Sequence, residues 1–200
     1  MDKEKLNGKK VAILATNGFE ADELNLPKKA LEQAGAKVTV VSLESGAIKG
    51  WKNGNWEGSV NVDLTIDKAF ADDFDALMLP GGPLNPDKLR LSKAAIDFVK
   101  SFNTAKKPIA AICHAPSILI EADIVRNRQV TSWPSIRMDL INAGAQWVNS
   151  EVVADEGLVT SRKPADIPAF NQKMIEEFSE GRHNLRDQVQ SETERLSTRH

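Results

Sequence analysis

Short apolar runs alternate along the chain with longer segments of mixed polarity. The apolar runs are 11–16, 38–43, 76–79 and 109–112, and each has the length of a buried strand. Apolar residues at helical spacing predict helices over 20–34, 88–102, 115–122, 135–142 and 167–178. Strands that alternate with helices form right-handed crossovers. The pattern therefore predicts a mostly parallel sheet with helices on both faces.

Three further segments complete this outline. Residues 44–68 are rich in Gly, Asn and Trp and alternate near their end, which predicts a hairpin or an edge excursion. A short strand is expected over 130–132, and two more within 147–161. No internal repeat or linker is evident, so residues 1–180 are expected to form one domain. The polar tail 181–200 is expected to be disordered or to dock on a neighbour as a short helix.

Composition narrows the class of protein. The 200 residues carry a formal net charge of −2, with 41% apolar and 27% charged residues, so nothing favours nucleic acid or an anionic membrane as a partner. No apolar run has the roughly 20 residues of a transmembrane helix. Residues 1–10 lack the apolar stretch of a signal peptide. The single cysteine excludes an internal disulfide. We therefore expect a cytoplasmic protein.

The segment 109–116 carries the clearest chemical signal. The apolar strand Ile109–Ile112 leads directly into Cys113 and His114, and a helix is expected at once. This is the pattern of a nucleophile elbow, in which the reactive side chain faces a helix N-terminus. Such a site is expected to lower the pKa of Cys113 below the roughly 8.5 of a free thiol. The competing interpretation is that Cys113 is a buried small hydrophobic residue, as lone cysteines often are.

Four segments together resemble the DJ-1/PfpI superfamily, and within it the PfpI-like (peptidase C56) branch of general stress proteins. These segments are 17–20 after the first strand, 79–82 after the third, 111–116 at the elbow and 160–166 near the end. Their order and spacing match the branch from about residue 9 to residue 180. The resemblance implies a flavodoxin-like three-layer α/β sandwich with a mostly parallel central sheet and a cysteine nucleophile elbow.

The resemblance also implies roles for individual residues. Cys113 corresponds to the family nucleophile, and Glu20 to the glutamate whose carboxyl hydrogen-bonds the sulfur. Gly81 and Gly82 correspond to the strand end that forms the oxyanion hole, although a glycine pair is also common in an ordinary tight turn. His114 is expected to relay protons.

Two more positions belong to the expected pocket, and a third is a candidate for a contact between subunits. Ala115 stands where the family usually has glycine, and Trp133 occupies a position that carries an aromatic residue in the family. In PfpI-like assemblies a carboxylate from an adjacent subunit approaches the histidine, and Asp87 is the matching candidate here. An exposed helix N-cap is the alternative interpretation of Asp87. The resemblance implies a homo-oligomer, either a dimer or a larger assembly.

Two functions follow from these residues. The first is a stress-response hydrolase or lyase in which the Cys113 thiolate attacks a carbonyl of a peptide bond, a 2-oxoaldehyde or a glycated amine. The second is a redox sensor or stress chaperone that uses oxidation of Cys113. No cofactor is expected, because the chain has neither G-x-G-x-x-G nor a P-loop. No metal site is expected either, because the chain has one cysteine and three histidines.

Overall fold

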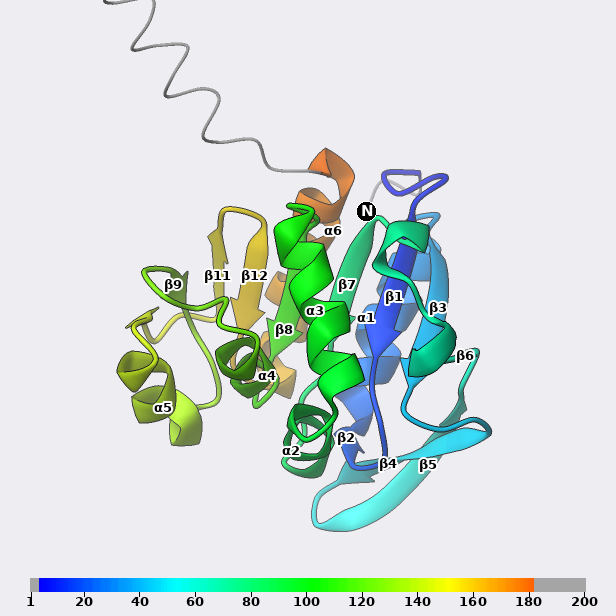
Figure 1. The fold of residues 1–200 in the computed structure, drawn as a ribbon, viewed down its shortest axis with the longest axis horizontal. Helices are drawn as coiled ribbons and strands as arrows, with labels where there is room; N and C mark the ends of the chain where they lie inside the picture. The colour runs from blue at the N-terminus through cyan, green and yellow to red at the C-terminus, as the bar shows by residue number, and fades with distance from the viewer. Residues whose placement is uncertain (1–3, 182–200) are drawn as a thin grey trace, which may run out of the picture.

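A computed structural model describes residues 4–181 as a three-layer α/β sandwich (Figure 1). Its central sheet has seven strands in the order β11-β12-β8-β7-β1-β3-β6, and all neighbours are parallel except β11 and β12. The strands are β1 (Lys10–Leu14), β3 (Lys37–Ser42), β6 (Leu64–Thr65), β7 (Ala76–Leu79), β8 (Ile109–Ile112), β11 (Val152–Asp155) and β12 (Leu158–Ser161). This architecture confirms the predicted fold class.

The helices cover both faces of the sheet, with α3 and α4 on one face and α1 and α6 on the other (Figure 1). The α-helices are α1 (Ala21–Gln33), α2 (Leu84–Arg90), α3 (Lys93–Thr104), α4 (Pro116–Glu121), α5 (Arg137–Asn142) and α6 (Ile167–Glu180). The 3-10 turns are η1 (Ile66–Lys68), η2 (Ala71–Asp73), η3 (Pro134–Ile136) and η4 (Pro164–Asp166).

One helix prediction is wrong. A single helix was expected over 88–102, but two helices, α2 and α3, occupy this part of the chain. They separate at Ser92, which has an extended backbone and whose side chain accepts a hydrogen bond from the N–H of Ala95. Serine in this position caps a new helix rather than continuing the old one.

Two small sheets flank the central one. The predicted hairpin is confirmed as β4 (Ala47–Lys52) and β5 (Asn55–Asn61), and β2 (Phe19–Glu20) pairs with β4. The second small sheet joins β9 (Gln129–Val130) to β10 (Gln146–Trp147). Because β2 belongs to the loop between β1 and α1, the hairpin fixes the path of the chain as it leaves the central sheet.

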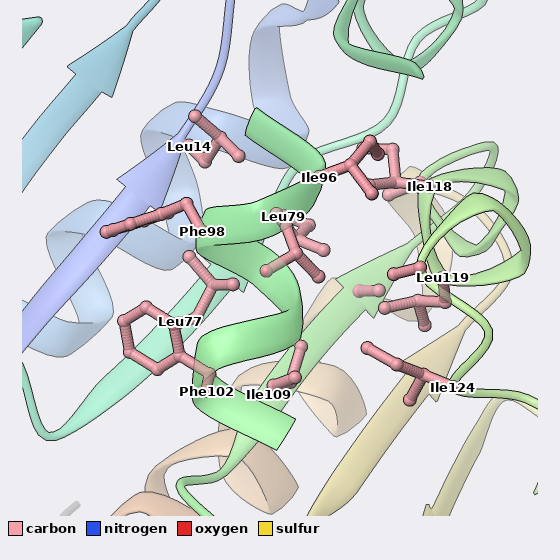
Figure 2. Close-up of a cluster of buried hydrophobic side chains, with 14 of the residues drawn as sticks. Leu14, Leu77, Leu79, Ile96, Phe98, Phe102, Ile109, Ile118, Leu119 and Ile124 are labelled. Atoms are coloured by element: carbon pink, nitrogen blue, oxygen red, sulfur yellow. The ribbon is translucent and has the colours of Figure 1, made fainter. Parts of the chain in front are cut away.

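The core explains why β7 and β8 are continuous apolar runs. On β7, Leu77 and Leu79 pack toward α3, while Ala76 and Met78 pack toward α1 and α6. Figure 2 shows Leu77 and Leu79 beside the side chains of α3. Successive side chains of a strand point to opposite faces, so a strand covered on both faces must be apolar throughout.

Two predictions concern the chain as a whole. Within residues 4–181, the structure contains no helix that is long and apolar enough to cross a membrane, and the predicted cytoplasmic location stays a prediction. The expected tail begins at residue 181, and its residues 182–200 lie outside the described residues.

Candidate active site

Cys113 lies at the carboxyl end of β8, in a turn that leads into α4. Its φ is +64°, a left-handed conformation that is uncommon for a residue with a side chain. Its backbone is held from both sides, because its N–H donates to the carbonyl of Ser161 at 3.0 Å and its carbonyl accepts from the N–H of Trp133 at 2.9 Å. A strained backbone fixed in this way is the structural mark of a nucleophile elbow.

Ala115 causes no strain in this elbow. Its φ is −58°, in the right-handed region, and it caps the short helix α4. The glycine that the family usually has at this position is therefore not required here for a positive φ. The strained position is Cys113 itself.

The structure corrects the prediction for the glutamate. Glu23, not Glu20, is the carboxyl that hydrogen-bonds the side chain of Cys113. Glu23 is fully buried, and its Oε2 accepts a hydrogen bond from the N–H of Gly81 at 3.1 Å. Its Oε1 has no nitrogen or oxygen partner among residues 4–181. The sulfur is thus the remaining polar neighbour of this carboxyl.

Glu20 has a different position because the helix begins one residue after it. Glu20 is the N-cap of α1, and its Oε2 accepts the N–H of Glu23 at 2.8 Å. Glu23 is the third residue of α1 and lies against the end of β7 through its bond to Gly81. Glutamate is not among the preferred N-cap residues, so the sequence around 20–23 carried no clear signal of which glutamate enters the buried site.

The pKa of Cys113, in its buried contact with Glu23, also differs from the prediction. Burial, and then the negative charge of Glu20, raise the pKa of Glu23 from its ordinary 4.5 to about 8. Burial, and then Glu23, raise the pKa of Cys113 above that of a free thiol. The backbone N–H groups of Gly82 and His114 lower the pKa of Cys113 but are outweighed. The expected depressed pKa of Cys113 is therefore wrong, because burial and the neighbouring carboxyl raise this pKa more than the two N–H groups lower it.

The N–H groups of Gly81 and Gly82 make different hydrogen bonds. The N–H of Gly81 is engaged by Glu23 and is not available to a substrate oxygen, contrary to its expected oxyanion role. The N–H of Gly82 hydrogen-bonds the sulfur of Cys113. A Cβ at Gly81 would lie 2.5 Å from Oε2 of Glu23 and 2.6 Å from Cβ of Cys113. This close approach requires glycine at position 81.

His114 lies directly against the sulfur. Its Nδ1 is 3.2 Å from Sγ of Cys113, and its Nε2 is 3.3 Å from Oγ of Ser135. The ring of Trp133 stacks on the imidazole, with 6.0 Å between centroids and 28° between planes. Burial lowers the pKa of His114, so its imidazole is neutral near pH 7. Sequence reasoning identified His114 and Trp133 but missed Ser135.

Asp87 lies in the first turn of α2 and is exposed. The expectations that it reaches His114 of a neighbouring subunit, and that the protein forms a homodimer or a larger assembly, stay predictions.

Asn85 is a second residue that the sequence analysis missed. It is fully buried in α2. Its Oδ1 accepts the N–H of Thr16 at 2.7 Å, and its Nδ2 donates to the carbonyls of Pro80 at 2.8 Å and Gly81 at 3.3 Å. Asn85 therefore ties the end of β1 to the turn that holds Glu23. No local pattern distinguishes such an asparagine from an ordinary helix residue.

Replacing Asn85 with alanine is expected to lower the free energy of unfolding by about 2–4 kcal/mol, because buried backbone groups lose their partners. Urea denaturation measures this change. The control is Asn103→Ala, at an exposed position in α3, which should change stability little. Equal stability of Asn85→Ala and the wild type would show that the three hydrogen bonds do not hold the turn.

The fold and the elbow together define a class: an α/β protein with a strained cysteine at the carboxyl end of a parallel strand, where ligands of such sheets bind. The family model described as "DJ-1/PfpI family" matches residues 9–177. The chain belongs to this family, which confirms the resemblance inferred from the four sequence segments.

Relatives and a solved structure agree with this assignment. The chain is 46% identical over 169 residues to General stress protein 18 of Bacillus subtilis, covering 84% of this chain and 96% of that protein. It is 45% identical over 166 residues to Deglycase PH1704 of Pyrococcus horikoshii, covering 83% and 97% respectively. The crystal structure of Drosophila melanogaster DJ-1beta superposes with a TM-score of 0.78 at 30% identity, covering 86% of this chain and 90% of that one.

Proposed function

We propose that this protein is a stress-response hydrolase of the DJ-1/PfpI type, in which Cys113 adds to the carbonyl of a small 2-oxoaldehyde or of an amine glycated by one. The observation that carries the proposal is the contact of one sulfur with two proton-carrying groups, Glu23 and His114. The relatives named deglycase and general stress protein support the same class of activity.

The raised pKa of Cys113 determines the first step. Because the resting thiol keeps its proton, a base must remove that proton as the sulfur attacks. The neutral imidazole of His114 suits this task, with Nδ1 3.2 Å from the sulfur. The S–H bond breaks, its proton binds Nδ1, and the sulfur forms a bond to the carbonyl carbon. The N–H of Gly82, beside the sulfur, is placed to stabilise the oxyanion.

The later steps need no external oxidant. With a 2-oxoaldehyde, the sulfur adduct carries a hydroxyl and a hydrogen on the attacked carbon. With a glycated amine, the carbon that bears the nitrogen first loses the amine: its hydroxyl proton moves to the nitrogen, the carbon–nitrogen bond breaks, and the aldehyde carbonyl so formed accepts the sulfur to give the same adduct. Moving that hydrogen as a proton to the neighbouring keto carbon, and the hydroxyl proton to the keto oxygen, gives a thioester of a 2-hydroxy acid, and water hydrolyses it. Glu23, with a pKa of about 8, is suited to carry this proton.

Burial of the sulfur favours a small substrate. Cys113 is 6% exposed, so a two- or three-carbon carbonyl compound reaches it more readily than an extended peptide. The raised pKa also argues against ready oxidation, because the thiolate is the form that oxidants attack. Both features favour carbonyl chemistry over peptide cleavage and over redox sensing.

The test is product formation from three substrate classes. The purified protein is incubated with methylglyoxal, with an amine freshly glycated by methylglyoxal, and with a fluorogenic peptide. We expect the 2-hydroxy acid from the first two and no peptide cleavage. Full alkylation of the single cysteine by iodoacetamide should stop the reaction. Turnover that survives full alkylation, or conversion of Cys113 to sulfinate by mild peroxide without any turnover, would contradict the proposal.

A further inference from the structure

Ser135 occupies the side of the imidazole ring opposite the sulfur. Its Oγ lies 3.3 Å from Nε2 of His114, while Nδ1 of the same ring faces Cys113 at 3.2 Å. Ser135 is the middle residue of η3, which follows Trp133 directly. The N–H of Trp133 donates to the carbonyl of Cys113 at 2.9 Å. The backbone hydrogen bond of Trp133 therefore holds the segment that carries Ser135 against the elbow.

We infer that Ser135 is a positioning residue for the proposed reaction: its hydroxyl accepts the Nε2 proton of His114 and so leaves the Nδ1 lone pair facing the thiol. This inference rests on the proposed function. A neutral imidazole carries one N–H, and the hydrogen bond made by one nitrogen decides which nitrogen holds it. Without an acceptor at Nε2, the proton can reside on Nδ1, where it blocks proton transfer from Cys113.

The hydrogen bond between Ser135 and His114 becomes stronger when His114 takes the proton of Cys113. When the thiol proton binds Nδ1, the ring becomes an imidazolium with two donors. One donates to the thiolate of Cys113, and the other donates to Oγ of Ser135. Hydrogen bonds from a charged donor are stronger than those from a neutral one, so Ser135 stabilises the reactive ion pair more than the resting pair. The stacked ring of Trp133 limits rotation of the imidazole away from both partners.

The surroundings of His114 make this effect separable from other titrations. Its pKa is lowered by burial, and no charged group contributes to that shift. Among residues 4–181, Cys113, from the turn after β8, is the titratable group that hydrogen-bonds the ring, and Asp87 of a neighbouring subunit stays a predicted second one. Ser135 and Trp133, from the η3 segment, are uncharged. Glu23, from α1, acts on Cys113.

The experiment follows the cysteine–histidine pair without requiring turnover. The rate of alkylation of Cys113 by iodoacetamide is measured from pH 5 to 10 in the wild type, Ser135→Ala and Ser135→Thr. Losing one hydrogen bond to the imidazolium is expected to slow alkylation near pH 7 about three- to tenfold in Ser135→Ala. The threonine variant should recover most of the rate, since it keeps the hydroxyl. Ser101→Ala, at an exposed position in α3, is the matched control and should behave as wild type.

Nitrogen NMR of the imidazole gives the second measurement. The His114 signal is identified by its loss in His114→Gln. We expect the Nε2–H tautomer in the wild type and a mixture of tautomers in Ser135→Ala. An unchanged tautomer, or an unchanged alkylation profile in Ser135→Ala, would overturn the inference. If the wild type turns over none of the carbonyl substrates while alkylation still depends on Ser135, the proposed function fails and the positioning role stands.

Discussion

Replacing Cys113 with alanine is expected to abolish turnover of methylglyoxal and its amine adducts, by at least about 1,000-fold. The proposed reaction passes through a bond between the sulfur and the substrate, and no other thiol exists in the chain. The strained φ of +64° is equally available to alanine, so the backbone cost does not increase. The fold should therefore persist, as measured by circular dichroism and urea denaturation.

Cys113→Ser provides the matched control. It keeps a proton donor of similar size beside Glu23 and His114 but replaces the thiol with a much weaker nucleophile. Both variants should be inactive and folded. A folded Cys113→Ala protein that retains turnover would move the chemistry to other residues and remove the basis of the proposed function.

Replacing Glu23 with glutamine is expected to change the pH dependence of stability. The pKa of Glu23 is about 8 in the folded protein, above its ordinary 4.5. Between these values the unfolded chain releases the proton that the folded protein keeps, so wild-type stability falls as pH rises from about 4.5 to about 8. Glutamine does not titrate. Relative to the wild type, the variant should therefore gain on the order of 4 kcal/mol between pH 5 and pH 8.

Urea denaturation of both proteins at pH 5, 6, 7 and 8 measures this difference. Glu20→Gln is the control, because it retains a side-chain oxygen at the N-cap of α1 but removes the charge that raises the pKa of Glu23. Glu20→Gln should change the pH dependence of the free energy of unfolding less than Glu23→Gln does. Parallel stability curves for Glu23→Gln and the wild type would show that Glu23 does not hold a proton in the folded protein.

The same glutamine variant has a second expected property. Above pH 8 the wild type places a carboxylate beside the sulfur, and two like charges in contact repel by about 4 kcal/mol at an effective dielectric constant of about 20. Removing the carboxylate should speed alkylation of Cys113 by at least about tenfold at pH 9. This result would show that the buried carboxyl suppresses the thiolate, as the direction of the shift in the pKa of Cys113 indicates.

The buried carboxyl of Glu23 is expected to lower the stability of the folded protein. Glu23 is fully buried, and burying an ionisable carboxyl opposes folding at neutral and higher pH. A protein selected for stability alone would have an apolar residue there. Retaining glutamate is consistent with a chemical task, because functional sites commonly sacrifice stability for activity.

Much of this molecule was predictable from the order of residues. β7 and β8 are apolar throughout, and β1 is apolar after Lys10, because helices cover both faces of the sheet. β3 is less regular, with an exposed Lys37 and a buried end, yet a short run rich in valine still identified it. The elbow at Cys113 was also predictable, because the strand, the cysteine and the next helix are adjacent in the sequence. Local order alone was enough for these features.

The tertiary structure decided which groups contact the sulfur of Cys113. It also decided whether that thiol keeps its proton. Glu20 and Glu23 are three residues apart, and the start of α1 determines which of them enters the buried site. Ser135 and Asn85 act through contacts with distant segments, which no local pattern encodes. The pKa of Cys113 depends on desolvation, a property of everything packed around the sulfur. The sequence alone indicated the fold and the cysteine of the elbow, because both arise from local pattern, whereas the hydrogen-bond partners of that cysteine and its protonation depended on three-dimensional packing.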